Sequence, residues 1–152
     1  MSAEYSELKK LSDKFRKNAG PAEQQVFLEK TCKELAARLL RELVKSTPVG
    51  KYPKGTGKLG GTLRRGWTGG LKESAAQYMA YIPIERTSHM IKITLTNNVY
   101  YCEYVEYGHR TRGGAGWIKG KHFVKISTDD INSKAPEIIK QRLEQWLERN
   151  LK

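Results

Sequence analysis

One long stretch of the chain alternates apolar and polar residues with the spacing of an amphipathic helix. Between residues 22 and 46, apolar side chains recur every three or four positions, and Glu, Lys, Arg and Gln fill the remaining positions. The apolar stripe consists of Leu28, Cys32, Leu35, Leu39 and Leu43, widened by Ala36, Leu40 and Val44. The pattern predicts a long core helix that ends at Thr47-Pro48, with Cys32 as a buried thiol.

Similar spacing near both ends of the chain predicts two further helices. A short helix over residues 5–17 is indicated by Tyr5, Leu8, Leu11 and Phe15. Gly20 suits the end of this helix and Pro21 the first turn of the next, so residues 1–21 are expected to form an N-terminal extension. A final helix is indicated by Ile131, Ala135, Ile138, Ile139, Leu143, Trp146, Leu147 and Leu151, after a short apolar segment at Phe123, Val124 and Ile126.

The middle of the chain has the two-residue alternation of β-strands. One strand is predicted from Tyr78, Ala80, Ile82 and Ile84, and a second from Ile91, Ile93 and Leu95. Residues 85–89 fit the hairpin connection between them, and Asn97-Asn98 fits the next turn. A further strand is expected around residues 62–71, although glycines weaken the pattern there.

Residues 99–107 fit either a strand or a helix. Val99, Cys102 and Val105 are three residues apart, which favours a short helix that ends at Gly108. Together these elements predict an α+β fold, with a small antiparallel sheet of three or four strands packed against two long amphipathic helices. The chain has 152 residues and no repeat or linker, so a single domain over residues 1–152 is expected.

Charge changes this picture, because the whole positive excess lies in two segments. The net charge is +12; residues 43–72 carry seven basic residues, residues 108–125 carry five, and neither segment contains an acidic residue. The same segments contain 13 of the 14 glycines. We therefore expect two long basic glycine-rich loops, a mobile one over residues 48–61 and a second over residues 108–121. Such a basic surface binds a polyanion or an acidic protein partner.

The composition excludes a membrane-spanning protein and a fold that is stabilised by several disulfide bonds. No stretch approaches the roughly 18 apolar residues that a membrane span needs. The first residues show no basic region followed by an apolar one, so no signal peptide is expected. Two cysteines, Cys32 and Cys102, make no disulfide framework, which favours a reduced protein of the cytoplasm.

None of the candidate catalytic patterns meets its own requirements. Residues 55–60 match a dinucleotide-binding loop in spacing, but prolines precede it where a strand is needed and glycines follow where a helix is needed. Cys102 with His109 is a conceivable nucleophile pair and Glu103 with Glu106 a conceivable acid pair, yet a packed thiol and a solvated acidic edge are the simpler interpretations. No histidine stands at metal-ligand spacing from a cysteine. The sequence predicts no enzyme, no metal and no cofactor.

Several short motifs follow one another in a characteristic order. The long helix is preceded by Ser6-Glu-Leu-Lys-Lys-Leu11 and runs into Thr47-Pro48-Val49. The next motif is either Thr56-Gly-Lys-Leu59 or Thr62-Leu-Arg-Arg-Gly-Trp67. The last motif, before the final helix, is Tyr100-Tyr-Cys-Glu-Tyr-Val-Glu-Tyr-Gly108. Over most of residues 6–150 this order resembles the tail-component family of tailed bacteriophages, the small head–tail joining or tail-completion proteins. Two features depart from the family pattern, an inserted glycine–lysine stretch over residues 50–61 and His122-Phe123 in place of Pro-Phe.

The resemblance implies a non-enzymatic structural protein of a phage or prophage virion, synthesised in the cytoplasm of the bacterial host. Such proteins sit at the neck, where the portal-side connector meets the tail tube, and act as copies around an axis. The implied partners are other copies of the chain in a ring, together with neck, connector and tail-tube proteins. Genomic DNA in the channel is a further candidate partner, and no membrane is implied.

The two basic loops are the expected contact segments in this role. Arginine pairs with carboxylates through two parallel hydrogen bonds, so the loop arginines are expected to bind acidic edges of neighbouring subunits, with Glu103 and Glu106 as recipients. The alternative is a nucleic-acid-binding module, because the same loops interleave basic with aromatic residues, although no known nucleic-acid module is recognisable. The candidate assembly or DNA contacts are Lys51, Lys54, Lys58, Arg64, Arg65, Trp67, Glu103, Glu106, Arg110, Arg112, Trp117, Lys119 and Lys121.

Overall fold

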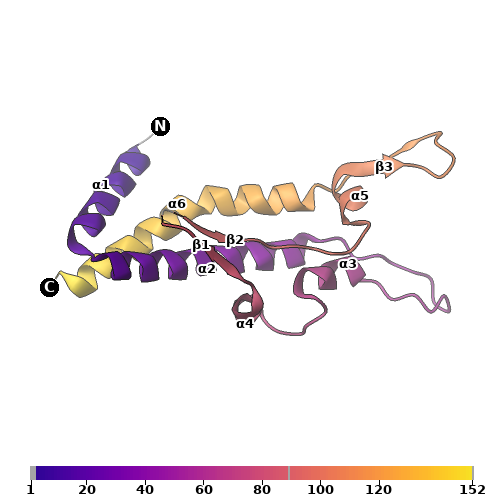
Figure 1. Ribbon diagram of the computed structural model, residues 1–152. Coiled ribbons are helices and arrows are strands. Elements are labelled where there is room, and N and C mark those ends of the chain that lie inside the picture. The colour runs from indigo at the N-terminus through magenta and orange to yellow at the C-terminus, as the bar shows by residue number, and fades with distance from the viewer. Residues whose placement is uncertain (1–2, 89, 152) are drawn as a thin grey trace.

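Two long antiparallel helices form the body of the molecule. The computed structural model describes residues 3–88 and 90–151, and α2 (Pro21–Ser46) and α6 (Phe123–Asn150) lie side by side and run in opposite directions (Figure 1). At the end where both termini lie, α1 (Ala3–Asn18) folds back and packs on α6. The predicted helices over residues 5–17 and 22–46 are confirmed as α1 and α2.

Local signals at the start of α2 agree with its boundaries. Pro21 occupies the first turn, and the Glu23 carboxylate accepts a hydrogen bond from the Gly20 backbone N–H at 3.1 Å. The buried residues of α2 are Thr31, Ala37, Leu40 and Leu43. Towards its N-terminus α2 therefore buries Thr31 rather than the predicted Leu28, which is exposed.

The final helix begins earlier than the sequence pattern predicts. Phe123, Val124 and Ile126, expected to form a separate apolar segment, belong to the first turn of α6. The Glu106 carboxylate accepts hydrogen bonds from the backbone N–H groups of Val124 at 2.9 Å and Lys125 at 3.1 Å. These first amides of the helix have no partner within it, so a carboxylate from a different element fixes where α6 starts.

Residues 62–68 are helical, and the strand predicted around residues 62–71 is wrong. The segment forms α3 (Thr62–Arg65) and the 3₁₀-helix η1 (Gly66–Thr68). Leu63 and Trp67 are buried while Arg65, midway between them, is exposed. A strand would place Arg65 on the same face as Leu63 and Trp67, whereas a helical turn separates it from them.

The strand predicted from Tyr78 to Ile84 is also largely wrong. Residues 75–81 form α4 (Ala75–Tyr78) and the 3₁₀-helix η2 (Met79–Tyr81). Ser74 and Gln77 make a capping box: the Ser74 hydroxyl accepts from the Gln77 N–H at 3.3 Å, and the Gln77 side-chain oxygen accepts from the Ser74 N–H at 3.0 Å. This local cap favours a helix over the apolar alternation that follows it.

Strands occur as two separate hairpins rather than as one sheet. β1 (Ile84–Arg86) pairs antiparallel with β2 (Ile91–Ile93), and β3 (Gly108–Arg110) pairs antiparallel with β4 (Trp117–Lys119). Among the described residues the fold is thus α+β, but the predicted sheet of three or four strands is replaced by two two-stranded sheets. The reason is that the other candidate strands are helical. His89, in the predicted β1–β2 connection, lies outside the described residues.

The helix predicted within residues 99–107 is confirmed as α5 (Cys102–Tyr107), which ends at Gly108.

The core has two parts. The larger cluster joins α2 to α3, η1, η2 and the start of α6 through Ala37, Leu40, Leu43, Leu63, Trp67, Met79 and Phe123. The smaller cluster, Phe15, Ala19 and Leu143, holds α1 on α6. Within the described part of the chain, no helix is both long and apolar enough to cross a bilayer.

Candidate assembly surface

Two basic segments project from the same end of the helical body, opposite to the chain termini (Figure 1). We call residues 48–61 the loop arm and residues 108–121 the hairpin arm. The loop arm has no helix or strand, whereas the hairpin arm, predicted as an irregular loop, contains β3 and β4. The structure therefore brings to one end of the molecule two basic segments that are separated by 46 residues of sequence.

The loop arm is anchored to the core by Thr47, the last residue before it. Thr47 is fully buried; its hydroxyl donates a hydrogen bond to the Leu43 carbonyl and accepts one from the Trp67 indole N–H at 2.8 Å. The indole also contacts Phe123 of α6 edge-on, with ring centroids 6.5 Å apart. Trp67, predicted as a contact residue, is thus part of the core beneath the arm.

Arg64 and Arg65 lie at the base of the loop arm. The Arg64 guanidinium donates to the carbonyls of Thr47 at 2.9 Å and Lys45 at 3.3 Å, and Arg65 donates to the Gly60 carbonyl at 3.3 Å. Both arginines bond to backbone carbonyls on the two sides of the arm's base. This places them as supports of the arm, a role for which no sequence pattern gave a signal.

The two sides of the loop arm approach each other closely at its base. A Cβ added at Gly60 would lie 2.0 Å from the Gly50 carbonyl oxygen, so only glycine fits there. Beyond this point the arm is exposed throughout, including Lys51, Lys54 and Lys58. The Lys58 ammonium lies 5.9 Å from the centre of the Tyr52 ring, within the range of a cation–π contact.

The hairpin arm is an ordered two-stranded ribbon. Its register pairs Gly108 with Lys119, His109 with Ile118 and Arg110 with Trp117. Thr111 closes the turn, because its N–H bonds to the Gly116 carbonyl and its hydroxyl accepts from the Gly116 N–H, both at 2.9 Å. Arg110, Arg112, Trp117, Lys119 and Lys121 are all exposed, and Trp117 exposes 62% of its surface.

Glu106 joins the hairpin arm to the body. Its carboxylate is buried and caps α6, and its backbone carbonyl accepts a hydrogen bond from the His122 N–H at 3.0 Å. A Cβ added at Gly120 would lie 2.2 Å from that same carbonyl, which shows how tightly the base of the hairpin packs on α5. Glu106 therefore bonds within its own chain, whereas Glu103, also predicted as a recipient of arginine, is exposed.

The half-buried Cys102 does not have the surroundings of an activated nucleophile. Burial, followed by the charges of Glu106 and Glu103, raises the pKa of its thiol above the ordinary value. A ring nitrogen of His109 lies 3.4 Å from the Tyr104 carbonyl, and the two rings are in edge contact. Across residues 3–88 and 90–151, no three His, Cys, Asp or Glu side chains cluster in a way that would hold a metal ion.

Sequence reasoning missed a row of exposed tyrosines beside the arms. Tyr100, Tyr104 and Tyr107 expose 87%, 56% and 67% of their surface, and Glu103 lies among them on α5. Their spacing of three and four residues was the available signal, because it is the spacing of neighbours on one side of a helix; in the structure Tyr104 and Tyr107 lie on α5 and Tyr100 just before it. The apolar residues Val99, Cys102 and Val105 have a similar spacing, and the helix was predicted from them without considering the tyrosines.

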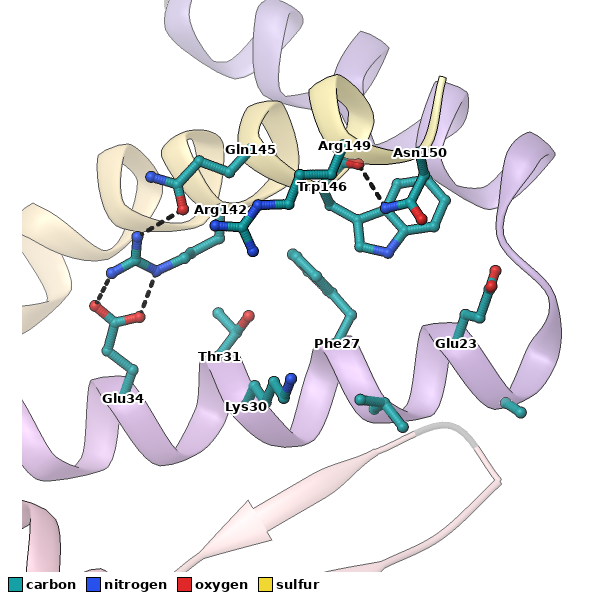
Figure 2. Close-up of a pocket in the computed structure, with 12 residues that line it drawn as sticks. Glu23, Phe27, Lys30, Thr31, Glu34, Arg142, Gln145, Trp146, Arg149 and Asn150 are labelled. Carbon is teal, nitrogen blue, oxygen red and sulfur yellow. Dashed lines mark hydrogen bonds and ion pairs between the residues drawn. The ribbon is translucent and has the colours of Figure 1, made fainter. Parts of the chain in front are cut away.

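A groove of about 580 Å³ lies at the opposite end of the molecule, between the start of α2 and the end of α6 (Figure 2). Phe27 and Trp146 point into the space between the helices, and Phe15 contacts both rings, with centroids 4.7 and 4.8 Å away. At one end of the groove, Arg142 forms a bidentate ion pair with Glu34, in which both nitrogen–oxygen distances are 2.6 Å.

The chain is similar to a known protein family over much of its length. A model of the family described as the bacteriophage HK97-gp10 tail component matches residues 7–108 of the 152. The match begins in α1 and ends at the first residue of β3, so it includes the loop arm but not the rest of the hairpin arm or α6. No curated protein and no solved structure matches the chain. Because the matched residues make up more than half of its length, the chain belongs to the HK97-gp10 family of bacteriophage tail components.

Proposed function

We propose that this tail component is a non-enzymatic structural subunit of the phage or prophage neck, where it completes the tail and joins it to the head. Several copies form a ring, and the two arms contact neighbouring subunits and the adjoining connector or tail-tube proteins. The observation that carries the proposal is the arrangement of two firmly anchored basic arms at one end of a helical body. Family membership supplies the setting in the phage tail.

The anchoring of the arms supports a role in assembly. Thr47 and Trp67 fix one arm to the core and Glu106 the other, so the base of each arm has a defined direction. Beyond its base the loop arm makes few bonds and must lose conformational freedom when it binds. The loop arm of such a subunit binds its neighbours only where a partly assembled neck offers enough contacts to offset that cost.

The arginines of the hairpin arm are the best candidates for contact with acidic neighbours. Arg110 and Arg112 are exposed, and neither has an ion-pair partner within the described chain. A free guanidinium can make two parallel hydrogen bonds to a carboxylate of an adjacent subunit. Arg64 and Arg65 bond to the backbone at the base of the loop arm, so reversing their charge would also disturb the fold. Reversing the charge of the hairpin arm is therefore the cleaner test of assembly.

The test is a protein inventory of phage particles from a host in which the chain is replaced by its variants. We expect the wild-type chain in purified particles at a fixed ratio to capsid and tail proteins. Arg110→Glu with Arg112→Glu should lower the yield of infectious, tailed particles at least tenfold, because like charges then face each other across the joint. The matched control, Lys9→Glu with Lys14→Glu on exposed positions of α1, makes the same charge change and should assemble normally. Particles that form without the chain would refute the proposal.

A second candidate function is DNA binding by the arms. Exposed aromatic rings accompany the basic residues in both arms, Tyr52 in one and Trp117 in the other. Basic residues neutralise phosphates and aromatic rings stack on unpaired bases. The two functions are compatible if the arms face the channel of the ring.

A further inference from the structure

Exposed tyrosines lie on α5 and in the turn just before it. Tyr104 and Tyr107 lie on α5 together with Glu103, and Tyr100 lies in the turn just before this helix; we call these four exposed residues the tyrosine stripe. Tyrosine is enriched at protein–protein interfaces because it combines a large apolar ring with a polar end. Three such side chains in a row are more than a solvated helix needs, and they indicate a docking surface.

The groove at the other end of the molecule has complementary properties. Its lining is largely apolar: Phe27 and Trp146 point into it, and Val26, which is 53% exposed, also lines it. A volume of about 580 Å³ lies within the range of pockets that enclose ligands with several rings. It is therefore large enough to take up more than one tyrosine side chain.

The charges around the groove also match the stripe. Arg142 is neutralised by Glu34, and Lys30 and Arg149 at the groove are exposed and have no ion-pair partner among the residues described. Glu23, an exposed acid that also lines the groove, accepts a hydrogen bond from the Gly20 N–H, so the three basic and two acidic residues of the groove leave a net charge of +1. Glu103, the charged member of the stripe, is likewise exposed and unpaired within that part of the chain. The acidic residue among the tyrosines thus has as its counterpart a groove that carries a net positive charge beside its aromatic rings.

We propose that the tyrosine stripe of one copy docks into the groove of the next copy, with Glu103 placed against Lys30 and Arg149. This interface rests on the proposed role as a ring subunit and supplies the contact on which a ring depends. Stripe and groove lie at opposite ends of the molecule, so each copy offers both and the contact is head-to-tail. Repetition of such a contact forms a ring when the rotation between copies closes.

The first experiment uses two variants that each lose one half of the interface. Tyr104→Ser with Tyr107→Ser removes the stripe, and Val26→Arg fills the groove; both changes are at exposed positions and should leave the fold intact, which circular dichroism and melting temperature verify. Native mass spectrometry and analytical ultracentrifugation then give the size of each species. Tyr5→Ser, which changes an exposed tyrosine of α1, is the matched control.

The wild type and the control should form oligomers at high concentration, and each variant alone should stay monomeric. A mixture of the two variants should give a dimer and nothing larger, because only one intact stripe and one intact groove remain. Loss of the tyrosines should weaken association by about thirtyfold or more, as expected for a central aromatic contact. A wild type that stays monomeric at about 1 mM, or a mixture that forms no dimer, overturns the proposal.

Charge exchange tests the pairing of specific residues. Glu103→Lys and Lys30→Glu should each weaken association roughly tenfold, and the chain that carries both should recover most of the loss. Failure of the double variant to recover any affinity argues against this docking geometry. The particle inventory remains a separate measurement: if Val26→Arg particles contain the chain and assemble normally, docking through the groove is wrong while the neck function stands.

Discussion

At the scale of single residues, several polar side chains bond within the chain where the sequence suggested contact with partners. Trp67 and Glu106 are buried, and Arg64 bonds to the backbone at the end of α2. A sequence shows that such a residue can make strong hydrogen bonds, but it does not show with which partner. Buried polar groups must be paired, so the tertiary structure decides this question through burial.

Glu34 gives a prediction at this scale. Hydrogen bonds from Arg142, and then from Arg38, outweigh partial burial and lower the pKa of its carboxyl from 4.5 to about 2. A group whose pKa is lower in the folded state adds stability above its unfolded pKa, so this contribution should be lost as the pH falls from about 4.5 to about 2.

The measurement is the free energy of unfolding by urea, for the wild type and for Glu34→Gln, at pH values from 7 down to 2. We expect the substitution to lower the free energy of unfolding by about 1–2 kcal/mol at pH 7, less than the pKa shift alone suggests because the ion pair is partly solvated. The difference should shrink at pH 2 to 3. The control Glu148→Gln, at an exposed position, should leave stability unchanged. An equal loss at both pH values would contradict the assigned ion pair.

At the scale of elements, contacts between residues distant in sequence set boundaries that local sequence patterns did not predict. The start of α6 depends on a carboxylate from α5, and residues 62–68 are helical because Leu63 and Trp67 pack into the core. The capping box at Ser74, in contrast, is a local signal that indicates a helix, and the strand prediction rested on the apolar alternation alone. Alternation over four or five residues is weak support for a strand when a helix cap precedes it.

The dependence of α6 on Glu106 is testable. Glu106→Ala should lower the free energy of unfolding by about 2 kcal/mol, because two helix amides lose their acceptor and the base of the hairpin arm loses a contact. Hydrogen exchange should increase most at Val124 and Lys125. Glu103→Ala, one turn away and exposed, serves as the control and should change neither quantity. Unchanged exchange at both amides would show that the cap does not set the start of the helix.

At the scale of the whole molecule, charge and apolar surface are distributed unequally between the two ends. The arms carry most of the positive excess at one end, beside the tyrosine stripe, and the aromatic groove lies at the other. A molecule with two different ends is suited to head-to-tail contacts between copies. Its basic end is suited to an acidic neighbour or to DNA.

A salt titration separates these two partners of the basic end. If the arms contact phosphates, affinity for duplex DNA should fall by at least about tenfold between 50 and 200 mM salt, since each phosphate contact releases a counterion. Lys51→Ala, Lys54→Ala and Lys58→Ala together should flatten that dependence, whereas Lys9→Ala with Lys14→Ala should not. Absence of binding even at low salt would remove the DNA function and leave the assembly function as the account of the arms.

The sequence alone determined the features that depend on local order: the long helix α2, the turn at residues 18–21, the short helix before Gly108, the two acid-free basic segments and the family. Each follows from spacing or composition within one stretch of chain, where helix periodicity and charge are directly readable. Tertiary structure decided that residues 108–121 form a hairpin, that Trp67 and Glu106 anchor the arms, and that stripe and groove lie at opposite ends. These features depend on which distant segments meet, because burial and backbone pairing are properties of the packed molecule rather than of any one segment.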